Sequence, residues 1–236
     1  MGLDIYVGSF TRYYCGDWET AAARAAREQG IPFEVVRPNP GPQDAVKDPA
    51  VIHQAVESWR TALEAGMRQE LVDGLSWDER AGAGYFTERP GWVGYSGVVL
   101  LAAHTACPDH PRPEFSITHF DNDAAFQDLA AREFRCNFSH VFEVEIWLPC
   151  AFAFTFRAQD IAGHEVIFGS SRTLLEQLRR LNNDIYKADA ETLGRWKSEG
   201  ACSADLFDQS ARFGLAMFLH HAELSVEHRL PMRLDY

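Results

Sequence analysis

The sequence predicts a single α+β domain over residues 1–236, in which helices pack around a mainly antiparallel sheet. Residues 140–169 contain three short runs of alternating apolar and polar residues separated by turns, which is typical of a meander of antiparallel strands. On both sides of this central segment, apolar residues recur at helical spacing. The sequence shows no repeat, low-complexity tract or interdomain linker, so one domain is expected.

Composition and charge limit the possible functions. The chain has 236 residues, 46% hydrophobic and 24% charged, as in folded globular proteins. A net charge of −12 disfavours binding to nucleic acid and to anionic membranes, whereas an acidic surface attracts basic partners. Five cysteines without a C-x-x-C pair suit free thiols, and the N-terminus lacks the features of a signal peptide. We therefore expect a cytoplasmic protein that binds neither nucleic acid nor a membrane.

The N-terminal segment is expected to begin with a strand. Apolar and polar residues alternate over residues 3–7, which predicts a strand with one buried face. A turn follows over residues 8–16, and Asp17 is expected to cap a helix that runs to about residue 29. A second strand is predicted over residues 33–36.

Helices are predicted over most of the next hundred residues. Asp48 followed by proline is a typical helix start, and the apolar spacing after it predicts an amphipathic helix over residues 49–72. The nearly apolar run over residues 92–107 is too short to span a membrane and predicts a buried helix. Prolines make residues 108–120 irregular, and another helix is expected from about residue 123.

The C-terminal third is also mostly helical. Helices are predicted over residues 173–186, from residue 189, and over residues 204–222. The second half of the last helix is apolar on nearly all sides, which is typical of a central, buried helix. Residues 224–234 are expected to add an edge strand.

The N-terminus also resembles known sequences. The run MGLDIYVG at residues 1–8, followed by TRYY at 11–14 and GDWET at 16–20, resembles the start of uncharacterised bacterial proteins. The resemblance covers only this short part of the chain. It implies a bacterial origin, and no activity comes with it.

Two segments are rich in residues that recognise ligands or partners. The turn over residues 8–17 leads to a predicted helix start, where backbone amides and the helix dipole favour anions. The stretch over residues 82–95 combines glycines with tyrosine and tryptophan, as binding loops do. The predicted contact residues are Arg12, Tyr13, Tyr14, Cys15, Tyr85, Trp92 and Tyr95. The alternative is that these aromatic side chains pack into the core.

A second candidate site would bind a divalent metal. Imidazole and carboxylate groups are the usual ligands of catalytic zinc and non-haem iron. The candidate ligands are His104, His110, His119 and Asp121. This segment matches no specific metal-binding template, and Asp121 or Asp123 could equally cap the next helix.

Three further groups each have a competing structural interpretation. Residues 169–173 could hold an anion or cap the following helix through Thr173. His220 could share an ion with the carboxylate three residues later or be a buried core histidine. Glu143 and Glu145 could act as acid and base or form the solvated face of a strand.

The sequence therefore favours a binding or interaction protein without catalysis, with an immunity-like or regulatory role. Its expected partner is a basic protein or a small molecule, and no cofactor is predicted. Two alternatives stay open. One is a metal-dependent hydrolase that uses the four candidate ligands and a divalent metal, and the other is a small-molecule sensor.

Overall fold

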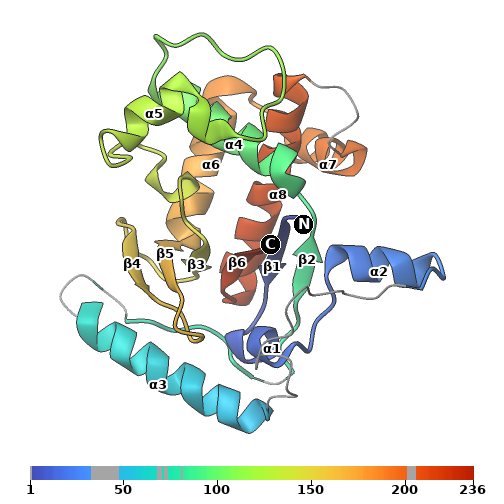
Figure 1. Ribbon diagram of the computed structural model, residues 1–236, viewed down its shortest axis with the longest axis vertical. Helices are drawn as coiled ribbons and strands as arrows, with labels where there is room; N and C mark the ends of the chain where they lie inside the picture. Colours follow the sequence, from blue (N-terminus) through green and yellow to red (C-terminus); the bar gives the residue numbers. More distant parts are fainter. Residues whose placement is uncertain (1, 33–47, 68–70, 72–73, 81, 201–205) are drawn as a thin grey trace.

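The computed structural model describes residues 2–32, 48–67, 71, 74–80, 82–200 and 206–236, and it has the expected α+β class (Figure 1). The described strands form one six-stranded sheet in the order β2-β1-β6-β3-β5-β4. The strands are β1 (Asp4–Val7), β2 (Phe86–Glu88), β3 (Ile146–Leu148), β4 (Phe156–Gln159), β5 (Glu165–Ser170) and β6 (Met232–Asp235). Neighbouring strands are antiparallel except β3 and β5, which are parallel. The strand predicted over residues 33–36 lies outside the described residues.

Helices cover both faces of this sheet. They are α1 (Phe10–Cys15), α2 (Ala21–Glu28), α3 (Pro49–Met67), α4 (Gly91–Ala106), α5 (Ala124–Ala130), α6 (Ser171–Ile185), α7 (Ala190–Glu199) and α8 (Phe207–His228). One core contains buried residues of α4, α5, α6 and α8, and the other contains residues of α1 and α3. In Figure 1, α3 runs beneath the sheet, and α2, which has no buried residue, projects to one side. None of the described helices combines the length and apolar character needed to cross a membrane.

Strand β3 shows why the two cores form on opposite faces. Successive side chains of a strand point to opposite faces of the sheet. Trp147 accordingly belongs to the core under α4, α6 and α8, whereas Ile146 and Leu148 belong to the core under α3. All three residues are fully buried, so this strand is apolar throughout.

Helices α4 and α8 approach each other at glycines. A Cβ atom added to Gly214 would lie 1.9 Å from the carbonyl oxygen of Gly94, and one added to Gly97 would lie 2.4 Å from the carbonyl carbon of Ser210. The two helix backbones are therefore in direct contact at these positions. Such a contact leaves no space for any side chain larger than a hydrogen atom.

The arrangement of the strands corrects two details of the prediction. Residues 140–169 do not form a meander, because β5 lies between β3 and β4 and pairs in parallel with β3. Strands β4 and β5 form a hairpin. Strand β5 is the more deeply buried of the two, and the half-exposed β4 forms the edge of the sheet. Strand β6 is not an edge strand but lies between β1 and β3, with Met232 and Leu234 buried. Sequence alternation alone does not specify which strands become neighbours.

The starts of α1, α2 and α6 also differ from the prediction. Residues 10–15, predicted as part of a turn, form α1, which ends at Gly16 in the left-handed conformation with φ of 72°, and α2 begins only at Ala21. Ser9 and Thr20 cap these helices, and Asp17 is exposed and caps neither. Similarly, α6 is capped by the Ser170 side chain, which accepts a hydrogen bond from the Thr173 amide.

Strand β1 is buried on both faces because its polar residues have internal partners. Asp4 accepts a hydrogen bond from Nε of Arg89 at 2.6 Å, and the ring of Tyr6 packs against those of Tyr13 and Trp18. The sequence predicted that only one face would be buried, since alternation with polar residues is typical of a half-solvated strand.

Two buried histidines predict how stability depends on pH. His140 accepts a hydrogen bond at Nδ1 from the Ser170 amide, and burial lowers its pKa to about 4. Nδ1 of His221 contacts the Met217 carbonyl oxygen at 2.8 Å, and burial likewise lowers the pKa of His221. Unfolded histidine binds a proton near pH 6.5, so the unfolded state takes up protons that the folded state does not. As the pH falls from about 6.5 toward 4, each of these two histidines is expected to lower the free energy of unfolding by up to about 3 kcal/mol.

Urea denaturation measured at a series of pH values tests this expectation. The His221→Gln variant keeps an amide donor for the carbonyl oxygen, and we expect it to lose less stability than the parent protein between about pH 6.5 and 5. The control is His119→Gln, because His119 is exposed. Equal pH dependence of the parent and the His221→Gln variant would contradict the prediction.

Candidate functional site

A recess of small-molecule size lies between α1, α3 and the loop that leads to β2. We call it the α1–α3 recess, and its volume is about 720 Å³. It is lined by Thr11, Pro49, Ala50, His53, Glu57, Arg60, Trp77, Asp78, Glu79 and Arg80. Small-molecule sites occupy roughly 300–1,000 Å³ and combine apolar walls with a few polar groups, so this recess has suitable size and composition.

A buried carboxylate joins the loop to α1. Glu79 accepts hydrogen bonds from the backbone amides of Phe10 and Thr11, each at 2.9 Å, and from Nε1 of Trp77 at 2.7 Å. These amides are at the start of α1, a helix that lies where the sequence predicted a turn. The predicted anion-binding position was instead the helix start near Asp17, and at the start of α1 the backbone amides bind the protein's own Glu79.

Two ion pairs border the recess, one on each wall. On α3, the Arg60 guanidinium donates to Glu57 and to the carbonyl oxygen of Trp77, and it lies 5.2 Å from the centre of the Trp77 ring. On the loop, Arg80 donates to Asp78 at 2.6 Å, and this contact lowers the pKa of Asp78. The recess thus presents cations and carboxylates side by side above an aromatic ring.

A hydroxyl group and an imidazole meet where α1 faces α3. The distance between the Thr11 hydroxyl and Nδ1 of His53 is 3.4 Å. Thr11 is buried and His53 is exposed. The pair supplies a donor and an acceptor that a bound ligand can reach from the solvent side.

Two of the predicted contact residues line a second, smaller recess of about 410 Å³ on the other side of α1. Its lining residues are Arg12, Gly16, Asp17, Trp18, Glu19 and Tyr85. The Arg12 guanidinium lies 5.2 Å from the centre of the Tyr85 ring, donates to the Ala83 carbonyl oxygen and is 3.4 Å from Asp17. Arg12 and Tyr85 thus lie together as predicted, but the contacts of Arg12 are largely internal.

The tyrosines beside Arg12 are part of a half-buried polar cluster. Tyr13 donates to Asp235 at 2.5 Å and Tyr14 donates to Asp160 at 2.7 Å, while Arg233 lies 4.0 Å from the centre of the Tyr13 ring. Burial raises the pKa of both tyrosines. These side chains bind α1 to β6 and to the turn between β4 and β5.

The other three predicted contact residues do not join this surface. Tyr95 is buried in α4, and Trp92 packs against Tyr95 and Tyr236. Cys15 is half-buried and ends α1, so it lies where backbone carbonyls point outward instead of preceding a helix start. Of the contact residues predicted over residues 82–95, only Tyr85 therefore lines a recess together with Arg12.

The four candidate metal ligands are not brought together. His104 contacts Asp123 at 3.1 Å, and His110 contacts Asp128 at 2.7 Å, which lowers the pKa of Asp128. His119 and Asp121 are exposed, and neither of them takes part in these two contacts. Asp123 also caps α5, as one interpretation of the sequence predicted. Within the described residues, no group of three or more His, Cys, Asp or Glu side chains is placed to hold a metal ion.

The remaining sequence candidates have structural partners. The Thr173 hydroxyl donates to the Phe152 carbonyl oxygen at 2.6 Å, so residues 169–173 connect β5 to α6. Glu143 and Glu145 precede β3 and do not share a strand face, and Glu145 accepts from the Tyr236 hydroxyl. His220 is half-buried, which lowers its pKa.

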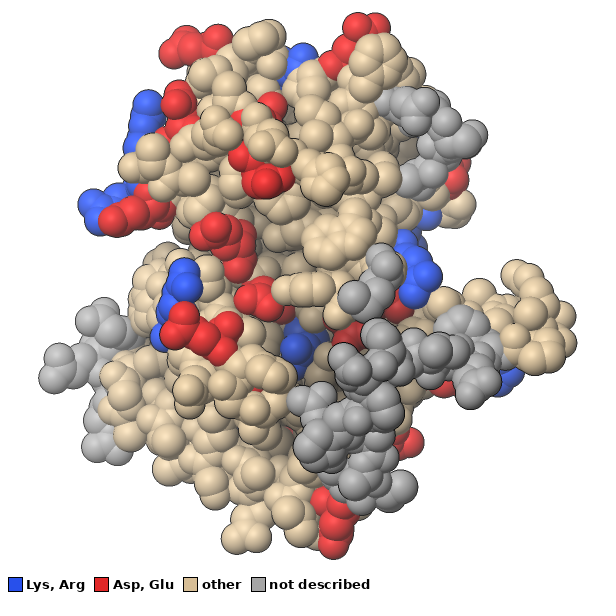
Figure 2. Space-filling model, in the orientation of Figure 1, with Lys and Arg blue, Asp and Glu red and all other residues tan. Residues whose placement is uncertain are grey.

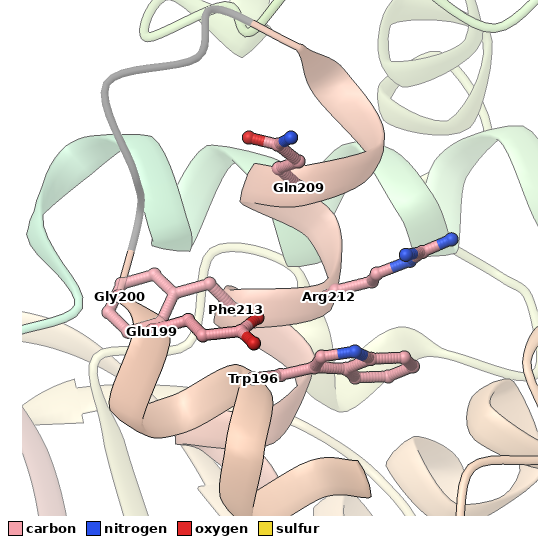
Figure 3. Close-up of a pocket in the computed structure, with 6 residues that line it drawn as sticks. All are labelled: Trp196, Glu199, Gly200, Gln209, Arg212 and Phe213. Carbon is pink, nitrogen blue, oxygen red and sulfur yellow. The ribbon is translucent and has the colours of Figure 1, made fainter.

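A third recess, of about 350 Å³, separates α7 from the start of α8 (Figure 3). The Trp196 ring and Glu199 approach it from α7, and Phe213 and Arg212 approach it from α8. The Arg212 guanidinium already pairs with Asp208 at 2.7 Å and lies over the Trp196 ring. Arg212 is thus paired within the protein, as Arg60 and Arg80 are, but this recess has about half the volume of the α1–α3 recess.

Acidic residues are spread over the molecular surface. On the face in Figure 2, carboxylate-bearing residues are distributed over both halves of the molecule, with lysine and arginine residues between them. Most of the described lysines and arginines outside the recesses are paired with carboxylates of the protein, for example Arg179 with Glu223 and Arg27 with Glu19.

Comparison with protein-family models, with curated proteins and with solved structures finds no match for this chain. The fold and the recesses are therefore the basis for a functional proposal.

Proposed function

We propose that this chain is a binding protein without catalysis that holds a small polar molecule in the α1–α3 recess. The observation that carries this proposal is the recess itself, with its volume of about 720 Å³ and its mixed lining of charged, aromatic and hydroxyl groups. The proposal keeps the binding role expected from the sequence and selects the small molecule from the two expected partner classes. A regulatory or sensing role follows from ligand binding of this kind.

The geometry supports binding better than it supports a metal-dependent hydrolase. The candidate metal ligands lie in separate histidine–carboxylate pairs and not in one cluster. A basic protein partner is also less favoured, because Tyr95 is buried, the half-buried Tyr13 and Tyr14 donate to internal carboxylates, and Arg12 is held by Asp17 and Tyr85. Neither the hydrolase nor the binder of a basic protein accounts for the small-molecule size of the α1–α3 recess.

A blocking substitution tests the location of the site. Ala50 is an exposed residue of α3 that lines the recess, and the Ala50→Trp variant is expected to fill the recess with an indole ring. In a ligand-observed NMR screen of polar fragments, we expect fragments that bind the parent protein to bind this variant about tenfold more weakly or not at all.

The matched control is Ala55→Trp, because Ala55 is exposed on the same helix and does not line the recess. Fragments should bind this variant as they bind the parent protein. The proposal fails if no fragment binds the parent protein, or if Ala50→Trp leaves binding of every fragment unchanged.

A further inference from the structure

We propose that the ligand of the α1–α3 recess is amphoteric: it carries an ammonium group and a carboxylate group beside an apolar side chain, as an amino acid or a dipeptide does. This inference rests on the proposed function and adds the chemical class of the ligand. It follows from how charge and apolar surface are distributed over the lining of the recess.

Both walls of the recess carry charge of both signs. Glu57 and Arg60 lie one turn apart on α3, and Asp78 and Arg80 lie two residues apart on the opposite loop. The Arg80 side chain is 84% exposed, so it can turn toward a ligand without leaving a buried position. A carboxylate group can therefore be met by Arg80 and Arg60, and an ammonium group by Glu57 and Asp78.

A ligand with a single charge fits this lining less well. A carboxylate that draws Arg60 or Arg80 from its ion pair would leave Glu57 or Asp78 unpaired, and an amine that draws the carboxylates would leave the arginines unpaired. Bringing a charge beside like charges in a partly desolvated recess is unfavourable. Glu79 is not available to pair with a ligand group, because backbone amides and Trp77 already occupy the acceptor oxygens of its buried carboxylate.

The apolar part of the lining predicts the apolar side chain of the ligand. Pro49 and Ala50, at the start of α3, and the Trp77 ring line the same recess as the two ion pairs. The Thr11 hydroxyl and His53 lie beside them and supply further hydrogen-bonding groups. The volume of about 720 Å³ exceeds that of one amino acid, so a dipeptide also fits.

Isothermal titration calorimetry at neutral pH and low salt, with four chemically matched probes, tests the ligand class. The probes are phenylalanine, the dipeptide alanyl-phenylalanine, phenylpropionate, which lacks the ammonium group, and phenethylamine, which lacks the carboxylate. We expect phenylalanine or the dipeptide to bind the parent protein at least about tenfold more tightly than either singly charged probe.

Charge-removing variants identify the groups that set this preference. Glu57→Gln is expected to weaken phenethylamine binding and to strengthen phenylpropionate binding, whereas Arg80→Gln is expected to do the reverse. Each variant should weaken binding of the amphoteric probes about tenfold. The controls are Glu223→Gln and Arg179→Gln, which remove an exposed ion pair between α8 and α6, on the opposite side of the sheet from α3, and should change nothing.

The outcomes separate this inference from the proposed function. If fragments bind and Ala50→Trp blocks them, but the singly charged probes bind as tightly as the amphoteric ones, the recess is a binding site and the ligand class is wrong. The ligand class is also wrong if none of the four probes binds, or if Glu57→Gln and Arg80→Gln leave all affinities unchanged. If Ala50→Trp leaves binding of every fragment and probe unchanged, the proposed function fails as well.

Discussion

Replacing Gly214 by alanine is expected to destabilise the protein by about 3–5 kcal/mol, because the new methyl group would overlap the backbone of α4. The added Cβ atom would lie 1.9 Å from the carbonyl oxygen of Gly94, far inside van der Waals contact. A backbone oxygen cannot move aside as a side chain can, so α4 and α8 would have to separate. These two helices form the centre of the larger core, and their separation would disturb its packing.

Gly194→Ala is the matched control for this prediction. Gly194 lies inside the exposed helix α7, and no atom lies within 4 Å of the position that its Cβ would take. Alanine is favoured over glycine in a helix by about 1 kcal/mol, so this variant should be slightly more stable than the parent protein. Urea denaturation followed by circular dichroism measures both changes. A loss below about 1 kcal/mol for Gly214→Ala would show that the helices are not in the close contact described.

The second large effect is expected for Glu79→Gln, which should destabilise the protein by about 2–4 kcal/mol. The Glu79 carboxylate uses both oxygens to accept hydrogen bonds from Phe10, Thr11 and Trp77, and its residue is only 6% exposed. A glutamine amide has a single acceptor oxygen. Its NH₂ group would face at least one buried N–H donor, which would lose its acceptor.

Glu19→Gln is the control for the same chemical change at an exposed position. Glu19 accepts hydrogen bonds from Arg27 on the surface, and such ion pairs contribute about 0–1 kcal/mol. Thermal denaturation should therefore show a decrease in Tm of about 5–10 °C for Glu79→Gln and little change for Glu19→Gln. Equal Tm values for the two variants would contradict the role of Glu79 in holding the loop to α1.

The elements with a strong local pattern could be predicted from the sequence. The apolar run over residues 92–107 predicted a buried helix and corresponds to α4 (Gly91–Ala106). Asp48 followed by Pro49 predicted the start of α3, which begins at Pro49. Asp123 similarly caps α5. In these cases, periodicity or capping chemistry acts within a few residues, so the sequence contains the necessary information.

The candidate site could be predicted only in part. Arg12 and Tyr85 were expected to lie on one surface and do line one recess. The α1–α3 recess was not predicted, because its residues come from three segments and none of them forms a recognisable motif. The one available signal was a glutamate and a tryptophan close together in a glycine-rich stretch, and this signal does not reveal that Glu79 binds the amides of α1.

The sequence by itself determined the α+β class, the positions of most helices and the acidic character of the surface, since these depend on local periodicity and on composition. Only the tertiary structure decided that β6 lies between β1 and β3, that β5 separates β3 from β4, and that Tyr13 and Tyr14 of the N-terminal turn bond to internal carboxylates. Strand neighbours and recess walls are set by contacts between residues far apart in the chain. The same alternating pattern is compatible with several such arrangements, and the side chains that pack best select one of them.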